Sequence, residues 1–458
     1  MGREILTEHD VIVLGAGPAG EVASGLLAGD GLDVALVERE LVGGECAYWA
    51  CMPSKALLRP GELLAEDRRV PGVPVGSLDV PTVLARRDKV IHGLDDSAQL
   101  PWVEDRGIHL YRGQGRLSGE RKVTVGGETT LSARRAVIVA VGSGAAMPPV
   151  PGLREIAPWT NRQGTTATHV PARLIVLGGG PVGCELAQAW SSLGSTVTLV
   201  EAAPRLLSRR EPFAGELVAA SLAEQGVEVR TGETADEAGL GNEGEFRLSL
   251  ESGDELVADE LLVCVGRRPH TDDLGLETVG LAPGESIAVD DHLRVPGHGD
   301  WLYAIGDVNG RALLTHVGKY QGAIVAANVM GRDATAIWDG PLSPQVVFCE
   351  PQVAAVGQTL QEALAAGLPA RAVDGDPGAT PGASFVGKGG RSGARIVVDE
   401  RREVMIGATL VGPEIAESLH AATIAIVGEV PLRRLAHAIP AFPTRSELWL
   451  RLLAEWRP

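Results

Sequence analysis

The chain has 458 residues, too many for a single hydrophobic core, so two or three domains are expected. Its formal net charge of −18 argues against nucleic acid and anionic membrane surfaces as partners. No apolar run is long enough to form a membrane span, and the N-terminus lacks the pattern of a signal peptide. The odd number of cysteines, without an export signal, predicts a cytoplasmic protein in a reducing compartment.

A short apolar strand at 10–14 leads directly into a glycine-rich turn, which is followed by an expected helix. A second strand at 34–37 ends in Glu38. This order of strand, turn, helix, strand and acid is the dinucleotide-binding fingerprint. Its glycines allow a tight turn and a close approach of pyrophosphate to the helix N-terminus, and Glu38 can accept the ribose hydroxyls. The fingerprint glycines are Gly15, Gly17 and Gly20.

The stretch 43–55 reads GGECAYWACMPSK and contains the closely spaced pair Cys46 and Cys51. On an ideal helix, residues five apart lie about 140° apart around the axis. A disulfide between them would therefore have to distort a helical turn. A strained and accessible bridge is easily reduced, which suits a redox carrier better than a structural crosslink. The alternative, two buried thiols that are close by chance, is disfavoured.

The fingerprint recurs in the middle of the chain. A strand at 174–177 enters a second glycine turn, a helix follows, and a strand at 196–200 ends in Glu201. Two such units predict two bound dinucleotides. The second set of glycines is Gly178, Gly180 and Gly183.

Together these stretches resemble the FAD-dependent pyridine nucleotide–disulfide oxidoreductases, which include dihydrolipoamide dehydrogenase, glutathione reductase, mercuric reductase and the soluble transhydrogenase. The resemblance implies an α/β fold with two Rossmann-type dinucleotide-binding domains and a C-terminal α+β dimerisation domain. It places an FAD-binding domain at 1–150 and 271–340, an NAD(P)-binding domain at 151–270 and an interface domain at 341–458. The first fingerprint is assigned to FAD, the second to a nicotinamide cofactor, and the protein is expected to be a homodimer.

Three further stretches match this family: VIVAVGS at 137–143, GRRP at 266–269 and YAIGD at 303–307. The helix expected after 315 would direct the positive end of its dipole at the flavin. An ordinary polar role for the histidine at its start is an equal alternative. The additional cofactor-binding residues that the resemblance implies are Gly44, Gly142, Gly266, Gly306, Asp307 and His316.

The resemblance also assigns catalytic roles. It makes Cys51 the sulfur beside the flavin and Cys46 the sulfur that attacks the substrate, and it pairs Lys55 with Glu185. A helix N-terminus and the Lys55 cation are both expected to lower a thiol pKa and favour the thiolate. The alternative for Glu185 is an exposed acid in the first turn of a helix, favoured by the dipole.

The acid Glu201 bears on the choice of nicotinamide. An acid at this strand end accepts the 2′-hydroxyl of NADH and repels the 2′-phosphate of NADPH, so NADH is favoured. Because Arg205, Arg209 and Arg210 follow closely and could reach a phosphate, NADPH remains the less favoured alternative.

The sequence departs from the disulfide reductases of this family near its C-terminus. Those enzymes carry His-Pro-Thr-x-x-Glu, and here Phe442 precedes Pro443 and Thr444, with Glu447 retained as a catalytic candidate. Phenylalanine cannot relay a proton, and His437 is more simply an ordinary interface histidine.

The sequence therefore predicts an enzyme that passes electrons from NADH through FAD to the Cys46–Cys51 pair and on to a small-molecule acceptor that it does not identify. A first alternative is a quinone or dye reductase, or a transhydrogenase, that acts directly from the flavin. A second is dihydrolipoamide dehydrogenase, which Phe442 disfavours. The remaining alternative is a non-catalytic, redox-sensing flavoprotein. No metal motif is found.

Overall fold

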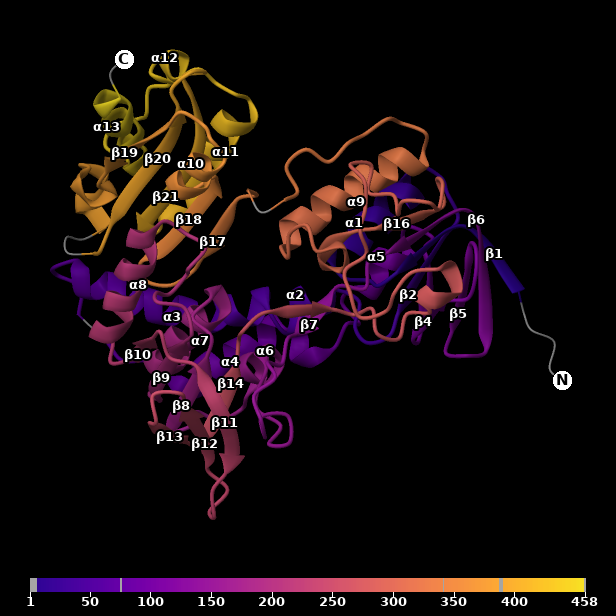
Figure 1. Cartoon of the computed structure of the whole chain (residues 1–458), viewed down its shortest axis with the longest axis horizontal. Coiled ribbons are helices and arrows are strands. Elements are labelled where there is room, and N and C mark those ends of the chain that lie inside the picture. The colour runs from indigo at the N-terminus through magenta and orange to yellow at the C-terminus, as the bar shows by residue number, and fades with distance from the viewer. Residues whose placement is uncertain (1–5, 75, 341, 387–389, 457–458) are drawn as a thin grey trace. The chain divides into compact units, whose positions relative to one another are not determined.

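The computed structural model describes residues 6–74, 76–340, 342–386 and 390–456, which form two compact units (Figure 1). The first unit combines Met1–Pro53, Asp88–Ala145 and Arg267–Ser343, and the second combines Ser54–Arg87, Ala146–Gly266 and Pro344–Pro458. The segments expected to bind NAD(P) and to form the interface thus belong to one unit. The four-segment domain division remains a prediction.

A seven-stranded sheet organises the first unit. Its parallel part has the order β3-β2-β1-β6, and β16 pairs parallel with β6. The antiparallel strands β5 and β4 continue the sheet beyond β6. All five residues of β2 are buried, as expected for a parallel strand covered on both faces. The strands are β1 (Leu6–Leu14), β2 (Val34–Glu38), β3 (His109–Arg112), β4 (Gly115–Leu117), β5 (Lys122–Val125), β6 (Thr129–Val139) and β16 (Leu302–Ala304), with a separate ladder of β7 (Ser143–Ala145) and β15 (Arg267–Pro269).

Two helices far apart in sequence, α1 (Pro18–Gly29) and α9 (Thr315–Val329), pack side by side in this unit (Figure 1). Their approach depends on small residues, because a methyl group added to Gly322 would lie 2.8 Å from the Ala19 carbonyl oxygen. The unit also contains α2 (Gly44–Tyr48) and α5 (Leu100–Glu104). Helices α3 (Cys51–Arg69) and α4 (Val80–Val90) each contribute residues to both units.

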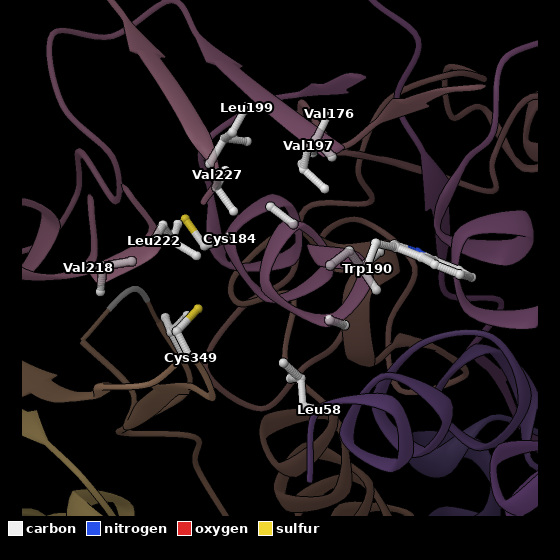
Figure 2. Packing of buried hydrophobic residues seen from close by; sticks show 14 of the residues in the cluster. Leu58, Val176, Cys184, Trp190, Val197, Leu199, Val218, Leu222, Val227 and Cys349 are labelled. Carbon is white, nitrogen blue, oxygen red and sulfur yellow. The ribbon is translucent and has the colours of Figure 1, made fainter. Parts of the chain in front are cut away.

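The second unit contains the repeated Rossmann element, a parallel sheet of order β10-β9-β8-β14. Helix α7 (Pro181–Ser192) lies in its core, where Cys184 and Trp190 pack among aliphatic side chains (Figure 2). The strands are β8 (Arg173–Leu177), β9 (Thr196–Glu201), β10 (Glu228–Thr231) and β14 (Glu260–Val263), with a meander of β11 (Ala235–Leu240), β12 (Phe246–Leu250) and β13 (Glu255–Ala258), and helices α6 (Asn161–Thr166) and α8 (Pro212–Glu224).

The C-terminal part of the second unit is a five-stranded antiparallel sheet of order β17-β18-β21-β20-β19. Apolar runs at 345–348, 353–356, 394–398 and 404–411 predict four of these strands. The edge strand β19 is not predicted, because its sequence lacks a β-branched or aromatic run. The strands are β17 (Gln345–Val347), β18 (Gln352–Gly357), β19 (Ala370–Gly375), β20 (Gly393–Asp399) and β21 (Val404–Gly412), with helices α10 (Leu360–Ala365), α11 (Leu419–Val427), α12 (Leu432–Leu435) and α13 (Leu448–Glu455). Among the described residues, no helix combines the length and apolarity needed to cross a bilayer.

Candidate active site

The cysteine pair lies at a break between two helices. Cys46 belongs to α2, which ends at Tyr48, and Cys51 is the first residue of α3. The break removes the angular separation that a continuous helix would impose, so the two side chains approach and share a hydrogen bond. No disulfide joins them in this structure. The reducible bridge remains a prediction, and the geometry supports it.

The N-terminal turn of α9 contacts this pair within the first unit. Thr315, the first residue of α9, lies with its Oγ1 3.4 Å from the Cys51 Sγ, and it also hydrogen-bonds Cys46. Lys319, one turn further along, adds a positive charge near Cys46. The sequence indicated this helix but not that Thr315 belongs to the cysteine site. His316 is exposed at the same helix start.

The surroundings of Cys46 raise the pKa of its thiol. The hydrogen bond with Cys51, burial and the like charge of a Cys51 thiolate raise the pKa of Cys46, while Thr315 and Lys319 oppose the rise. The expectation of a lowered thiol pKa is therefore wrong for Cys46. Two interacting thiols lose their protons in separate steps, and the second step is the harder one.

Lys55 and Glu185 form the pair that the sequence indicated, inside the second unit. The Lys55 Nζ lies 2.6 Å from Glu185 Oε2, and the Phe348 N–H donates to Glu185 Oε1 at 2.9 Å. The ammonium also lies 4.8 Å from the centre of the Phe348 ring. The Glu185 side chain is 6% exposed, so the reading of Glu185 as an exposed helix-start acid is wrong.

Replacing Lys55 with Met should lower the free energy of unfolding by about 2 kcal/mol, because it leaves the buried Glu185 carboxylate without its cation. The loss should be smaller than for a fully buried pair, since Lys55 is 37% exposed. Denaturant unfolding is the measurement, and Lys89→Met, at an exposed position of α4, is the matched control. Adding Glu185→Gln should recover part of the loss. Equal stability of Lys55→Met and wild type would contradict a structural role for the pair.

The two glycine turns repeat one hydrogen-bond pattern. In the first unit, Ala16 N–H donates to Glu38 Oε2 at 2.7 Å and Glu40 N–H donates to Oε1 at 2.8 Å. Gly20 closes the turn, because a side chain there would overlap the Gly15 carbonyl. The helix N-cap, Gly17, faces open space where a nucleotide phosphate can approach. These residues fit the adenosine and pyrophosphate of FAD.

The second turn makes the same contacts. Gly179 N–H donates to Glu201 Oε2 at 2.5 Å, and Ala203 N–H donates to Oε1 at 2.7 Å. Gly180, the N-cap of α7, again faces open space. Arg205 donates to the carbonyls of Ser208 and Arg210, so its guanidinium is engaged by its own loop. This second turn fits a nicotinamide dinucleotide.

Asp307 is held by two residues that sequence reasoning left unassigned. The Ser143 hydroxyl donates to Asp307 Oδ2 at 2.5 Å, and Arg267 Nε lies 3.3 Å from the same oxygen. Arg267 in turn donates to the Ser143 hydroxyl and carbonyl at 2.7 and 2.5 Å. Ser143 begins β7 and Arg267 begins β15, and the pairing of these two strands brings the two residues together. Gly142 and Gly266 directly precede the two strands. Gly306, just before Asp307, has φ +72° and lies against Ala19 of α1.

One further acid near the first glycine turn was missed. Glu21, in the first turn of α1, has its pKa raised to about 7 by burial, although the charge of Lys319 opposes the rise. Lys319 therefore acts on both Glu21 and Cys46. A glutamate one residue after a fingerprint glycine gave no distinctive sequence signal, because first-turn acids are common on helices.

The C-terminal residues belong to the second unit. Phe442 is 75% exposed and His437 is also exposed. Glu447 ends a short 3₁₀ turn, and among the described residues its buried Oε2 has no hydrogen-bond partner. A buried carboxylate oxygen left without a donor is costly.

The three cysteines outside the redox pair are most simply predicted to be buried small residues. Of these, Cys184 and Cys349 are buried (Figure 2). Cys264 is only partly buried, so the expectation holds for two of the three.

Comparison with known proteins gives consistent matches. Residues 9–326 match the family described as pyridine nucleotide-disulphide oxidoreductase, and residues 343–452 match the dimerisation domain of that family. A dihydrolipoyl dehydrogenase from Thermus scotoductus is 33% identical over 96% of this chain and 95% of its own length. A mercuric reductase from Staphylococcus aureus is 30% identical over 96% of this chain and 81% of its own length.

Solved structures resemble the whole chain. The HOCl-induced flavoprotein disulfide reductase RclA from Escherichia coli is 25% identical, with a TM-score of 0.86 over 97% of this chain and 99% of that one. LpdA from Mycobacterium tuberculosis has the same identity and TM-score, over 98% of this chain and 99% of that one.

Proposed function

The chain belongs to the pyridine nucleotide–disulphide oxidoreductase family, whose members are FAD-dependent enzymes with NAD(P)H as electron donor, and we propose that it uses Cys46 and Cys51 as a redox pair. The observation that carries the proposal is the meeting of both thiols with Thr315 at the helix break. A partly buried, hydrogen-bonded thiol pair at a helix N-terminus is an arrangement suited to thiol–disulfide exchange.

Bound FAD would supply the two-electron relay between the nicotinamide and the cysteines. Glu38 and the turn ending at Gly20 would hold its adenosine end, and Asp307, fixed by Ser143 and Arg267, would accept hydrogen bonds from its ribityl hydroxyls.

The two cysteines would act one after the other on an acceptor disulfide. Cys46 attacks an acceptor disulfide, and Cys51 then attacks the mixed disulfide, so the acceptor leaves as a dithiol and Cys46–Cys51 becomes oxidised. Each leaving sulfur needs a proton. The raised pKa of Cys46 means that this thiol also has to lose a proton before it attacks.

The function is tested by anaerobic titration of the FAD-loaded protein with NADH, followed by absorbance. A flavin plus a redox disulfide should take up about twice as many NADH equivalents as the flavin alone. Uptake equal to the flavin content would contradict a redox role for the cysteines. Absence of flavin reduction by either nicotinamide would contradict the oxidoreductase proposal as a whole.

We also propose that the active form is a homodimer. The region that matches the family's dimerisation domain exposes large apolar side chains, and it contains Glu447, whose Oε2 has no hydrogen-bond partner among the described residues. The exposed large apolar residues described in this region are Leu364, Phe385, Ile424, Val427, Ile439, Phe442 and Leu450.

The preference for NADH over NADPH should depend on Glu201. Its carboxylate is fixed by two backbone N–H groups, so it would meet a 2′-phosphate with an oriented negative charge. We expect Glu201→Gln to reduce the ratio of kcat/KM for NADH over NADPH by at least about tenfold, measured as flavin reduction. Glu233→Gln, in the loop after β10, is the control. A wild-type preference for NADPH would contradict the assignment.

A second function is favoured by Phe442: electron transfer from the flavin directly to a quinone, a dye or a second nicotinamide. This route needs no proton relay at the thiols. An acceptor panel with both nicotinamides distinguishes it from disulfide reduction.

A further inference from the structure

Three potential metal ligands converge at the amino ends of neighbouring strands in the first unit. His9 lies in β1, Asp33 directly precedes β2, and His109 is the first residue of β3. The parallel order β1-β2-β3 brings these positions together, because Val34 aligns with Val11 and Ala35 with His109. Their ligand atoms all lie within 4.8 Å of one another.

Both imidazoles approach the same carboxylate oxygen. His9 Nδ1 lies 2.8 Å from Asp33 Oδ1, and His109 Nε2 lies 3.4 Å from it. The two ring centres are 5.1 Å apart. Two imidazole nitrogens and one carboxylate oxygen at these separations can close around a single ion with bonds of about 2.0–2.2 Å after small side-chain adjustments.

Neighbouring groups already orient two of the ligands. The other ring nitrogen of His9, Nε2, lies 2.9 Å from the Tyr111 hydroxyl. The second oxygen of Asp33, Oδ2, lies 3.5 Å from Arg134. Metal-binding histidines and carboxylates are usually fixed in this way through the atom that does not touch the metal.

The local charge balance also favours a cation. Arg134 is shared among three carboxylates, with contacts to Asp10 at 2.8 Å and Glu8 at 3.1 Å besides Asp33. Arg135 adds a second positive charge near Asp10. Among the described residues named here, three acids therefore face two arginines. His9 is buried while the His109 side chain is 59% exposed, so an ion can reach the site from solvent.

We propose that His9, Asp33 and His109 form a binding site for a divalent transition metal such as Zn²⁺ or Cu²⁺. Two imidazoles and one carboxylate suit these ions and do not suit Mg²⁺ or Ca²⁺, which prefer oxygen ligands. Three protein ligands leave a coordination position for water.

The site lies at the opposite end of the strands from the dinucleotide turn. His9 and Gly15 are separated by six positions of β1 and its continuation, or roughly 20 Å at about 3.3 Å per residue. Binding there is therefore separable from cofactor binding and from the cysteine pair by mutation.

The test uses the EDTA-washed, FAD-loaded, oxidised full-length protein, so that a Cys46–Cys51 disulfide cannot ligate metal. One equivalent of Cu²⁺ should give an electron paramagnetic resonance spectrum with nitrogen hyperfine coupling, and Zn²⁺ should raise the melting temperature. His109→Ala changes an exposed residue and should weaken Zn²⁺ binding by at least about tenfold in calorimetry. Asp33→Asn should weaken it as well.

The matched control is His169→Ala, which removes an exposed histidine of the second unit whose nearest acid, Glu260, is 3.9 Å away. It should bind Zn²⁺ as the wild type does. Absence of Zn²⁺ binding to the wild type, or equal affinity in His109→Ala, overturns the proposal. Mg²⁺ should have no effect, and stabilisation by Mg²⁺ equal to that by Zn²⁺ would also overturn it.

Discussion

With NADH as donor, the wild-type enzyme should reduce quinones or dyes faster than lipoamide or glutathione disulfide by orders of magnitude. Thiol–disulfide turnover needs a group that moves protons, and the resemblance of residues 442–447 to His-Pro-Thr-x-x-Glu implies that Phe442 replaces the histidine of the family's disulfide reductases. General acid–base catalysis by such a group contributes about 10²–10⁴-fold. Electron transfer directly from the flavin does not use this proton-moving group. The rate of quinone or dye reduction should therefore not depend on whether residue 442 is phenylalanine or histidine.

Two variants of Phe442 separate the alternatives. Phe442→Ala should leave the dye-reduction rate nearly unchanged, and because this side chain is 75% exposed in the chain, its loss should weaken dimer packing more than the fold. Phe442→His could rebuild a dyad with Glu447, whose Oε2 has no partner among the described residues, and raise disulfide turnover. Wild-type lipoamide turnover of about 10² s⁻¹ or more would show that another group supplies the proton. His437 and Glu21 would then be the first residues to replace.

The second large effect concerns the cysteine pair. Partial reduction of the wild type should produce a long-wavelength absorption band from a Cys51 thiolate beside oxidised flavin. Cys51→Ser should abolish the band, whereas Cys46→Ser should make it permanent, since no disulfide can form. Both variants should lose disulfide reduction almost completely. The physical reason is that the hydrogen bond with Cys51 and burial raise the pKa of Cys46, which disfavours its thiolate.

The control for this experiment is Cys264→Ser, because Cys264 lies in the second unit and burial raises its pKa to about 12. It should leave the reduced spectrum unchanged. If neither Cys46→Ser nor Cys51→Ser alters that spectrum, the pair plays no part in electron transfer.

The family and the fold class could be predicted from sequence because the glycine turns and the acids that follow them form short motifs with a fixed spacing. Gly15 and Gly178 begin turns that few other residues allow, and Glu38 and Glu201 follow at a fixed spacing. The matches to the family confirm that prediction. The Lys55–Glu185 pair depended on the resemblance, because nothing local links residues 130 positions apart.

The features that could not be predicted from sequence depend on contacts between segments that are far apart in the chain. The pKa of Cys46 depends on its partners Cys51 and Thr315. Thr315 follows the second dinucleotide-binding fingerprint in the sequence and lies 269 positions after Cys46. The convergence of His9 and His109 requires the strand order of the sheet, which spacing alone does not specify. Strand β19 was missed because its pairing with β20, rather than its composition, makes it a strand.

Segments of the two units alternate along the sequence, so the first unit can be completed only late in translation. Strand β6 cannot gain its neighbour β16, nor α1 its cover α9, until residues 302–329 have emerged, and all of Ala146–Gly266 is translated first. During that interval the apolar face of α1 around Ala19 and Ala23 has no α9 to cover it. We therefore expect the nascent first half to bind chaperones that recognise apolar surface, and a chain truncated near residue 266 to aggregate rather than fold into a small FAD-binding protein.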